Sequence, residues 1–177
     1  MIEGKIIPAI RTNEDLLVAL ESNVDSVFLL NTNIEMIAEQ IKATHQAGKK
    51  LFVHIDLIEG VGKDEYGIKY LGALGVDGII STRTNIIKIA KRLGVFTIQR
   101  FFIVDSRSIE TTVEAVLSSK ADVVEIMPGT IGKIINKIKN MIEMPIVAGG
   151  IIETQEEIDQ ALESGAIAVS TGKKDLW

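Results

Sequence analysis

Short apolar runs rich in β-branched residues recur along the chain, and the segments between them carry apolar residues at helical spacing. Because most of these runs are apolar throughout rather than alternating, they are typical of parallel strands that are covered on both faces. They predict eight strands, at residues 5–11, 26–30, 51–56, 78–82, 96–102, 122–127, 145–150 and 166–171. The helical spacing predicts seven helices between them, at residues 12–22, 33–47, 64–74, 85–93, 108–119, 130–141 and 154–164.

Residues that commonly begin or end helices support these boundaries. Thr154, with Glu157 three residues later, has the spacing of a capping box. Several glycines follow a predicted helix and precede a predicted strand, where a left-handed residue often terminates a helix. They are Gly48, Gly75, Gly94 and Gly165.

The regular alternation of strands and helices predicts a parallel sheet within one domain, residues 1–177. We expect a compact TIM-type (β/α)8 barrel, an α/β fold, whose last helix is missing or reduced to residues 173–177. A doubly wound open sheet is the alternative, but strands of similar length at nearly equal spacing favour closure.

Two strand ends late in the chain have the composition of a phosphate site. One strand ends in Gly149 and Gly150, where the absence of a Cβ atom allows backbone N–H groups to approach an anion. The next ends in Ser170, Thr171 and Gly172, which add hydroxyl donors. In (β/α)8 barrels the loops after strands 7 and 8 frequently bind phosphate, so we predict that these residues do so. Each end could instead form only a tight turn.

Polar residues inside the other apolar strands concentrate toward the carboxyl ends, which meet at one mouth of a barrel. They are His54, Asp56, Gln99, Arg100 and Glu125. Beside a phosphate site, this set favours a small polar phosphate ester whose hydroxyls bind carboxylates and whose charge Arg100 offsets. Singly, Asp56 could cap a turn and His54 could be a hydrogen-bonded core residue. Arg100 and Glu125 could form one structural ion pair.

The same residues leave catalysis open. No lysine lies at the carboxyl end of a predicted strand, which argues against a Schiff-base aldolase. An acid/base isomerase using Glu125, or Asp56 with His54, is an alternative. A metal site formed by His54, Asp56 and Glu125 is another, although the spacing specifies no geometry for it.

Composition narrows the class of protein. Hydrophobic residues make up 46% of the 177 residues, as expected for a globular chain, and no apolar run approaches the roughly 20 residues of a membrane span. The chain contains no cysteine, which excludes disulfides and thiolate chemistry and makes the cytoplasm the expected compartment. A net charge of −5 gives no general attraction to nucleic acid or to a membrane.

Six segments, taken in order, carry a resemblance to a known family. They are His54–Gly60, Gly78–Thr82, Thr97–Phe102 with Asp105 and Ser106, Glu125–Gly129, Pro145–Gly150, and Ala168–Thr171 with Leu176 and Trp177. The chain resembles the glycerol-3-phosphate-responsive antiterminators of bacterial glycerol-uptake operons. The resemblance implies a regulator rather than an enzyme, with glycerol 3-phosphate as effector and no cofactor, that binds leader mRNA to prevent premature termination.

The resemblance also implies roles for the residues at the mouth. The phosphate would lie on Gly149, Gly150, Ser170 and Thr171. The glycerol hydroxyls would face Asp56, Glu125 and His54, with Gln99 and Arg100 alongside. A small phospho-metabolite enzyme on the same scaffold, without RNA binding, is the alternative function.

Basic residues on two predicted helices are the candidate RNA-binding residues. They are Lys88, Lys91 and Arg92 on the fourth helix and Lys133 and Lys137 on the sixth. Lys133 and Lys137 are four residues apart and therefore share a helix face. A solvated helix surface is the alternative, and the sequence shows no cluster of aromatic and basic residues on which bases could stack. A homodimer is one arrangement that would join the two patches.

Overall fold

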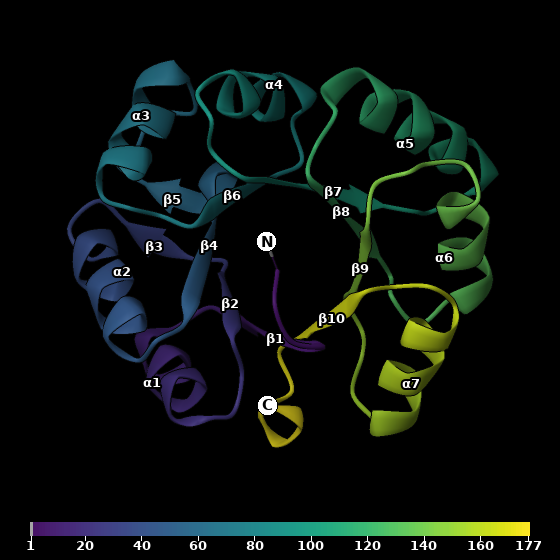
Figure 1. Cartoon of the computed structure of the whole chain (residues 1–177), viewed down its shortest axis with the longest axis horizontal. Coiled ribbons are helices and arrows are strands. Elements are labelled where there is room, and N and C mark those ends of the chain that lie inside the picture. Colours follow the sequence, from purple (N-terminus) through teal and green to yellow (C-terminus); the bar gives the residue numbers. More distant parts are fainter. Residues whose placement is uncertain (1) are drawn as a thin grey trace.

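Parallel strands close into a barrel in the computed structural model, which describes residues 2–177 (Figure 1). Each strand pairs in parallel with its two neighbours, and the last pairs with the first through Ile7 and Ser170. The predicted (β/α)8 barrel is therefore confirmed. Its strands, in order around the barrel, are β1 (Ile6–Ile10), β2 (Ser26–Leu29), β4 (Lys50–His54), β6 (Gly78–Ser81), β7 (Thr97–Phe102), β8 (Val123–Met127), β9 (Ile146–Gly149) and β10 (Ala168–Thr171).

Helices surround the barrel, and a short 3-10 turn, η2 (Lys174–Leu176), stands in place of an eighth (Figure 1). Lys174 forms an ion pair with Asp15 at 2.5 Å, and the indole N–H of Trp177 donates to the carbonyl of Thr171 at 3.0 Å. The end of the chain thus closes the ring between its first and last helices. The helices are α1 (Asn13–Glu21), α2 (Ile37–Gln46), α3 (Glu65–Ala73), α4 (Thr84–Arg92), α5 (Ser106–Ser119), α6 (Gly132–Lys139) and α7 (Gln155–Glu163).

The side chains of each strand alternate between two environments. One set fills the inside of the barrel, where Phe28 packs edge-on against Phe52 with ring centroids 5.8 Å apart. The other set packs under the helices in two clusters, one beneath α1 to α4 and one beneath α5 to α7. Strand parity therefore decides whether a polar side chain faces the inside of the barrel or the helices.

The predicted helix ends are confirmed at several places. Thr154 and Glu157 form the predicted capping box. The four glycines at the predicted helix ends have positive φ values: 73° at Gly48, 85° at Gly75, 75° at Gly94 and 107° at Gly165. No helix within residues 2–177 is long and apolar enough to cross a membrane.

Other boundaries differ from the prediction. The strand predicted at 51–56 ends at His54, and a 3-10 turn, η1 (Ile55–Leu57), follows it. After it, β5 (Ile58–Glu59) pairs with β3 (Thr32–Asn33), an additional sheet too short for periodicity to reveal. For this reason α2 begins at Ile37, and the Asn33 side chain accepts from the N–H groups of the preceding turn.

Thr130 does not cap α6 as predicted. The helix begins at Gly132, and its N-cap residue is Ile131, which forms no side-chain cap.

Gly78 is a test of packing inside the barrel. A Cβ atom at this position would lie 2.8 Å from the carbonyl oxygen of Phe96 and 2.9 Å from the Phe52 ring. We predict that Gly78→Ala lowers the free energy of unfolding by about 1–3 kcal/mol, measured by urea denaturation. Gly72→Ala is the control, because its Cβ would meet only Val95 at 3.7 Å. Equal effects of the two substitutions would contradict the packing described here.

Candidate functional site

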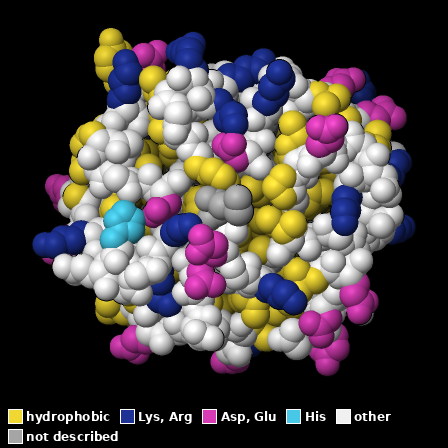
Figure 2. Space-filling model, viewed as in Figure 1, with side chains coloured by type: hydrophobic (Ala, Val, Ile, Leu, Met, Phe, Trp, Pro, Cys, Tyr) yellow, Lys and Arg dark blue, Asp and Glu magenta, His cyan; other side chains and the backbone are white. Residues whose placement is uncertain are grey.

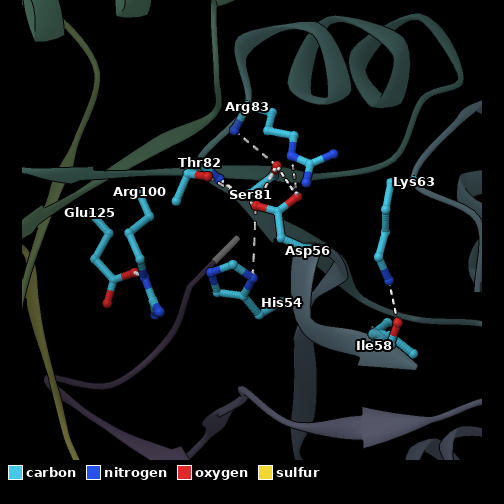
Figure 3. A network of polar contacts seen from close by, with 9 residues as sticks. All are labelled: His54, Asp56, Ile58, Lys63, Ser81, Thr82, Arg83, Arg100 and Glu125. Atoms are coloured by element: carbon cyan, nitrogen blue, oxygen red, sulfur yellow. Dashed lines mark hydrogen bonds and ion pairs between the residues drawn. The ribbon is translucent and has the colours of Figure 1, made fainter.

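A layer of polar side chains crosses the barrel just above its apolar interior. Arg100 of β7 donates through Nε to Glu125 Oε2 of β8 at 2.6 Å (Figure 3). Ser170 Oγ of β10 donates to the other oxygen, Glu125 Oε1, at 2.6 Å. All three side chains are buried, Glu125 completely. The structural ion pair considered for Arg100 and Glu125 is thus present, and it faces the mouth formed by the carboxyl ends of the strands.

Gly149 makes this layer possible. It neighbours Ser170 in the register of β9 and β10. A Cβ atom at Gly149 would lie 2.5 Å from Ser170 Oγ and 2.6 Å from Glu125 Oε1. Any larger residue would therefore displace the hydrogen bond between Glu125 and Ser170. The glycine is required for side-chain packing, whether or not its N–H also meets an anion.

Two buried polar atoms at this layer have no hydrogen-bond partner among residues 2–177: Arg100 Nη2 and His54 Nδ1. Burial, and then the positive charge on Arg100, lowers the pKa of the His54 imidazole to about 4, against an opposing effect of Asp56. His54 is therefore neutral near pH 7, with one ring nitrogen able to donate and the other to accept. Buried polar groups without a protein partner are uncommon, and at the mouth of a barrel they are available to a polar ligand.

Asp56 has a structural role that differs from the prediction. It lies on η1 rather than on the strand, and it accepts from Ser81 Oγ at 3.0 Å and from the Thr82 N–H at 2.8 Å (Figure 3). Arg83 Nε lies 3.6 Å from its other oxygen. The carboxylate therefore fixes the loop after β6, as in the turn-capping alternative.

Gln99 is placed wrongly by the prediction. Its amide donates to Thr84 Oγ1 of α4 at 3.0 Å and accepts from Ser119 Oγ of α5 at 2.5 Å. Because adjacent residues on a strand face opposite sides, Arg100 points into the barrel and Gln99 points under the helices. Gln99 joins two helices to β7 and does not reach the mouth.

The Thr171 hydroxyl likewise faces outward. It donates to the carbonyl of Ile152 at 2.7 Å and accepts from the Lys173 N–H at 3.0 Å, so it holds the loop between β9 and α7 against the end of β10. The donors left to an anion here are in the backbone. The N–H groups of Gly150, Ile151, Ile152 and Gly172 donate to no acceptor within residues 2–177.

The loop after β9 has a strained backbone. Gly150 and Ile151 both have positive φ, 77° and 59°, and the second value is rare for a β-branched side chain. Neighbouring contacts hold the loop, since the Gly129 N–H donates to the carbonyl of Gly149 at 2.6 Å. Strain of this kind concentrates at ligand sites, where the surrounding structure fixes it.

Lys63 is a residue at the mouth that the sequence analysis missed. It lies in the loop after β5, and its ammonium donates to the carbonyl of Ile58 (Figure 3). Burial lowers its pKa. The sequence did hold a signal for Lys63: Gly60 and Gly62 indicate a loop at the carboxyl end of a strand, where site residues lie.

The basic residues predicted to bind RNA lie on two separate helices. Lys and Arg side chains gather over α4, with acidic side chains beside them (Figure 2). Lys91 pairs with Asp122 at 2.6 Å and Arg92 pairs with Glu65 at 3.0 Å, so much of this charge is neutralised. The other three basic side chains are exposed and form no ion pair within residues 2–177; they are Lys88 on α4 and Lys133 and Lys137 on α6. Helix α5 lies between the two helices (Figure 1).

No group of three or more His, Asp or Glu side chains within residues 2–177 lies close enough to hold a metal ion. The alternative of a site formed by His54, Asp56 and Glu125 has no support in this geometry. Glu125 is held by Arg100 and Ser170, and His54 Nδ1 lies 4.0 Å from Asp56.

Comparison with known proteins places the chain in a family. Residues 6–177 match the family described as glycerol-3-phosphate responsive antiterminator. The chain belongs to this family. It is 36% identical to the glycerol uptake operon antiterminator regulatory protein of Listeria monocytogenes, with a TM-score of 0.94 over 99% of this chain and 95% of that one.

Two further relatives agree in length. A glycerol uptake operon antiterminator-related protein of Thermotoga maritima is 32% identical, with a TM-score of 0.89 over 100% and 99% of the two chains. The uncharacterized protein YgcP of Escherichia coli is 35% identical over 99% of this chain and 92% of its own length. The antiterminator family is regulatory.

The fold alone is shared with enzymes. An aldolase, QR15, has a TM-score of 0.75 at 16% identity, over 96% of this chain and 90% of its own.

The pKa of His54 predicts how stability depends on pH. Between pH 6.5 and 4 the unfolded chain binds a proton at His54 that the folded chain does not, so folding becomes less favourable as the pH falls through this window. We predict that His54→Phe removes about 2 kcal/mol of the loss in unfolding free energy between pH 7.5 and 5, measured by urea denaturation. Asn85→Ala, at an exposed position without a titratable group, is the control and should keep the wild-type loss. An unchanged loss in His54→Phe would contradict the burial of a neutral imidazole.

Proposed function

We propose that this chain senses glycerol 3-phosphate at the mouth of its barrel and, when loaded, binds the leader mRNA of glycerol-utilisation genes to prevent premature termination. Family membership and the solved antiterminator relative support this regulatory role. Because bacterial leader mRNA is made in the cytoplasm, we infer that the protein works there. Glycerol 3-phosphate is the effector in this proposal, and no cofactor takes part.

The observation that carries the ligand half is the pair of buried, unpartnered atoms His54 Nδ1 and Arg100 Nη2. Each such atom costs about 1–3 kcal/mol when it lacks a hydrogen bond. A bound hydroxyl can satisfy a neutral imidazole nitrogen as donor or acceptor, and any ligand oxygen can accept from Arg100. A glycerol moiety over the polar layer would satisfy both atoms.

The phosphate would lie on the neighbouring strand ends. Glu125 balances the charge of Arg100, so this pair alone offers little net attraction to an anion. The backbone N–H groups of Gly150, Ile151 and Gly172 have no internal acceptor and would supply donors. The N-terminus of α7 is not available to the phosphate, because the N–H groups of Glu153 and Thr154 donate to the Glu157 carboxylate. Ser170 is committed to Glu125 and would act by holding that carboxylate in place.

The same contacts disfavour catalysis. Both oxygens of Glu125 are already engaged, by Arg100 Nε and by Ser170 Oγ, so the carboxylate is held by the protein rather than directed at a ligand. The ammonium of Lys63 donates to a backbone carbonyl rather than facing His54 (Figure 3). We therefore propose a receptor rather than an enzyme. Unchanged 31P spectra of triose and glycerol phosphates after incubation with the protein are expected; turnover would favour the alternative enzyme.

His54→Phe tests the ligand site. The substitution removes an unpartnered nitrogen, so we predict weaker binding of glycerol 3-phosphate, about 5- to 50-fold by calorimetry, without loss of folding at pH 7.5. Gln99→Leu is the matched control, because it breaks two hydrogen bonds on the outer face of the barrel. It should lower stability and leave affinity within about twofold. The reverse pattern would move the ligand away from His54.

The regulatory half is tested with the leader transcript that precedes glycerol-uptake genes in the genome of origin. We predict that saturating glycerol 3-phosphate increases the affinity of the wild-type chain for this transcript relative to a scrambled transcript of equal length. Filter binding at several salt concentrations measures the difference. Equal affinity for both transcripts in the loaded protein would contradict the antiterminator function.

A further inference from the structure

A groove of about 510 Å3 opens between the N-terminal end of α5 and α6, which are neighbours outside β7 and β8 (Figure 1). Its lining is mainly apolar, with Asp105 and Ser106 at the start of α5 as polar exceptions; the apolar lining residues are Ile103, Val104, Ile109, Ile131 and Ile134. Two basic side chains, Lys133 and Lys137, lie on the α6 side of the groove. The groove therefore combines an apolar interior with a basic edge.

Large apolar side chains are exposed beside this groove. Val104, which lines it, is 84% exposed, and Phe102 at the end of β7 is 58% exposed. Both lie where the chain leaves β7 at the mouth of the barrel, with Ile103 between them. The sequence analysis found no cluster of aromatic and basic residues, because Phe102 and the two lysines come from segments about 30 residues apart.

The groove has positive charge that is not neutralised by ion pairs. Lys133 and Lys137 form no ion pair within residues 2–177. Asp105, the acidic residue in the groove, caps α5 by accepting from the Ser108 N–H at 2.8 Å. On α4, by contrast, Lys91 and Arg92 are each paired with a carboxylate. In a chain of net charge −5, the unpaired lysines of α6 thus attract an anionic partner more strongly than the paired basic residues of α4.

The groove is connected to the strand ends of the ligand site. Phe102 neighbours Met127 in the register of β7 and β8, and the Ile103 N–H donates to the Met127 carbonyl at 2.7 Å. The Met127 side chain lies 3.4 Å from the position that a Cβ atom would take at Gly150. The loop at Gly150 therefore lies next to the residues that position Phe102.

We propose that this groove binds single-stranded RNA, with phosphates on Lys133 and Lys137 and a base stacked on Phe102. Unpaired bases stack on exposed aromatic side chains while basic residues follow the backbone. Lys133 and Lys137 line the groove, and Phe102, which does not line it, stands at the rim of the mouth on the same strand face as Arg100. The inference rests on the proposed function, since it names the surface through which the loaded receptor holds its transcript. It assigns the RNA to α6 and the end of β7 rather than to α4.

Substitutions on the two helices test the assignment, with the fluorescently labelled leader transcript as the probe and saturating glycerol 3-phosphate in every sample. Lys133→Gln/Lys137→Gln should flatten the slope of log affinity against log salt by about 1.4, because each single-strand phosphate contact contributes about 0.7. Phe102→Ala should weaken binding about 5- to 150-fold. Lys42→Gln/Lys88→Gln removes the same charge from α2 and α4, where both side chains are exposed, and should leave binding unchanged.

The outcomes distinguish failure of the proposed function from failure of the groove assignment. If the wild-type chain does not prefer the leader transcript, the proposed function fails and the groove assignment falls with it. If the wild type binds but the α6 and Phe102 variants bind equally well, only the groove assignment is wrong. Loss of binding in Lys42→Gln/Lys88→Gln alone would overturn the groove assignment and place the RNA on α2 or α4. A change of oligomeric state in the groove variants, measured by sedimentation, would instead make the groove a contact between copies and overturn the assignment.

Discussion

The ion pair between Arg100 and Glu125 is the interaction on which the mouth of this barrel depends. Burying two opposite charges is costly unless each is well hydrogen-bonded, and removing one partner of such a pair commonly costs about 3–5 kcal/mol. Here contacts from β9 and β10 offset the cost: Ser170 of β10 donates to the second oxygen of Glu125, and Gly149 of β9, between them, leaves room for that hydrogen bond. The pair is satisfied on the carboxylate side and incomplete on the guanidinium side, where Nη2 has no partner within residues 2–177.

In the proposed function, this asymmetry would allow a rigid barrel to act as a receptor. A ligand that supplies oxygens to Arg100 and to neutral His54 would complete a layer that the protein leaves unfinished. Its phosphate would meet the strained loop at Gly150 and Ile151, which touches Met127 and hence the end of β7. Ligand binding would then stabilise the residues that position the end of β7, and the barrel itself would not need to change shape.

Most of the fold could be predicted from the sequence, because it follows from local physics. Unbroken apolar runs, helical spacing and glycines at helix ends each act within a few residues, and together they specify a closed barrel. The two-residue strands β3 and β5 could not be foreseen, since a pair of residues has no period. Because Asn33 belongs to β3, α2 begins at Ile37 and not at residue 33 as predicted.

The site was predicted less well because it depends on which way each side chain points. Arg100 and Glu125 were correctly expected at the mouth, whereas Gln99, one residue away, faces the helices. Asp56 was assigned by extending a strand two residues too far, into η1. Ion pairs join residues distant in sequence, so the neutralisation of Lys91 and Arg92 could not be read from charge alone.

The central claim is that ligand binding completes the layer at His54. The chain has two histidines, His45 and His54, so imidazole 15N signals can be assigned by a single substitution. During a titration with glycerol 3-phosphate, we predict that the Nδ1 signal of His54 shifts to saturation with the same dissociation constant as calorimetry gives, while the signals of His45 stay in place. Saturation of the protein with ligand while the His54 signals remain unmoved would contradict this account.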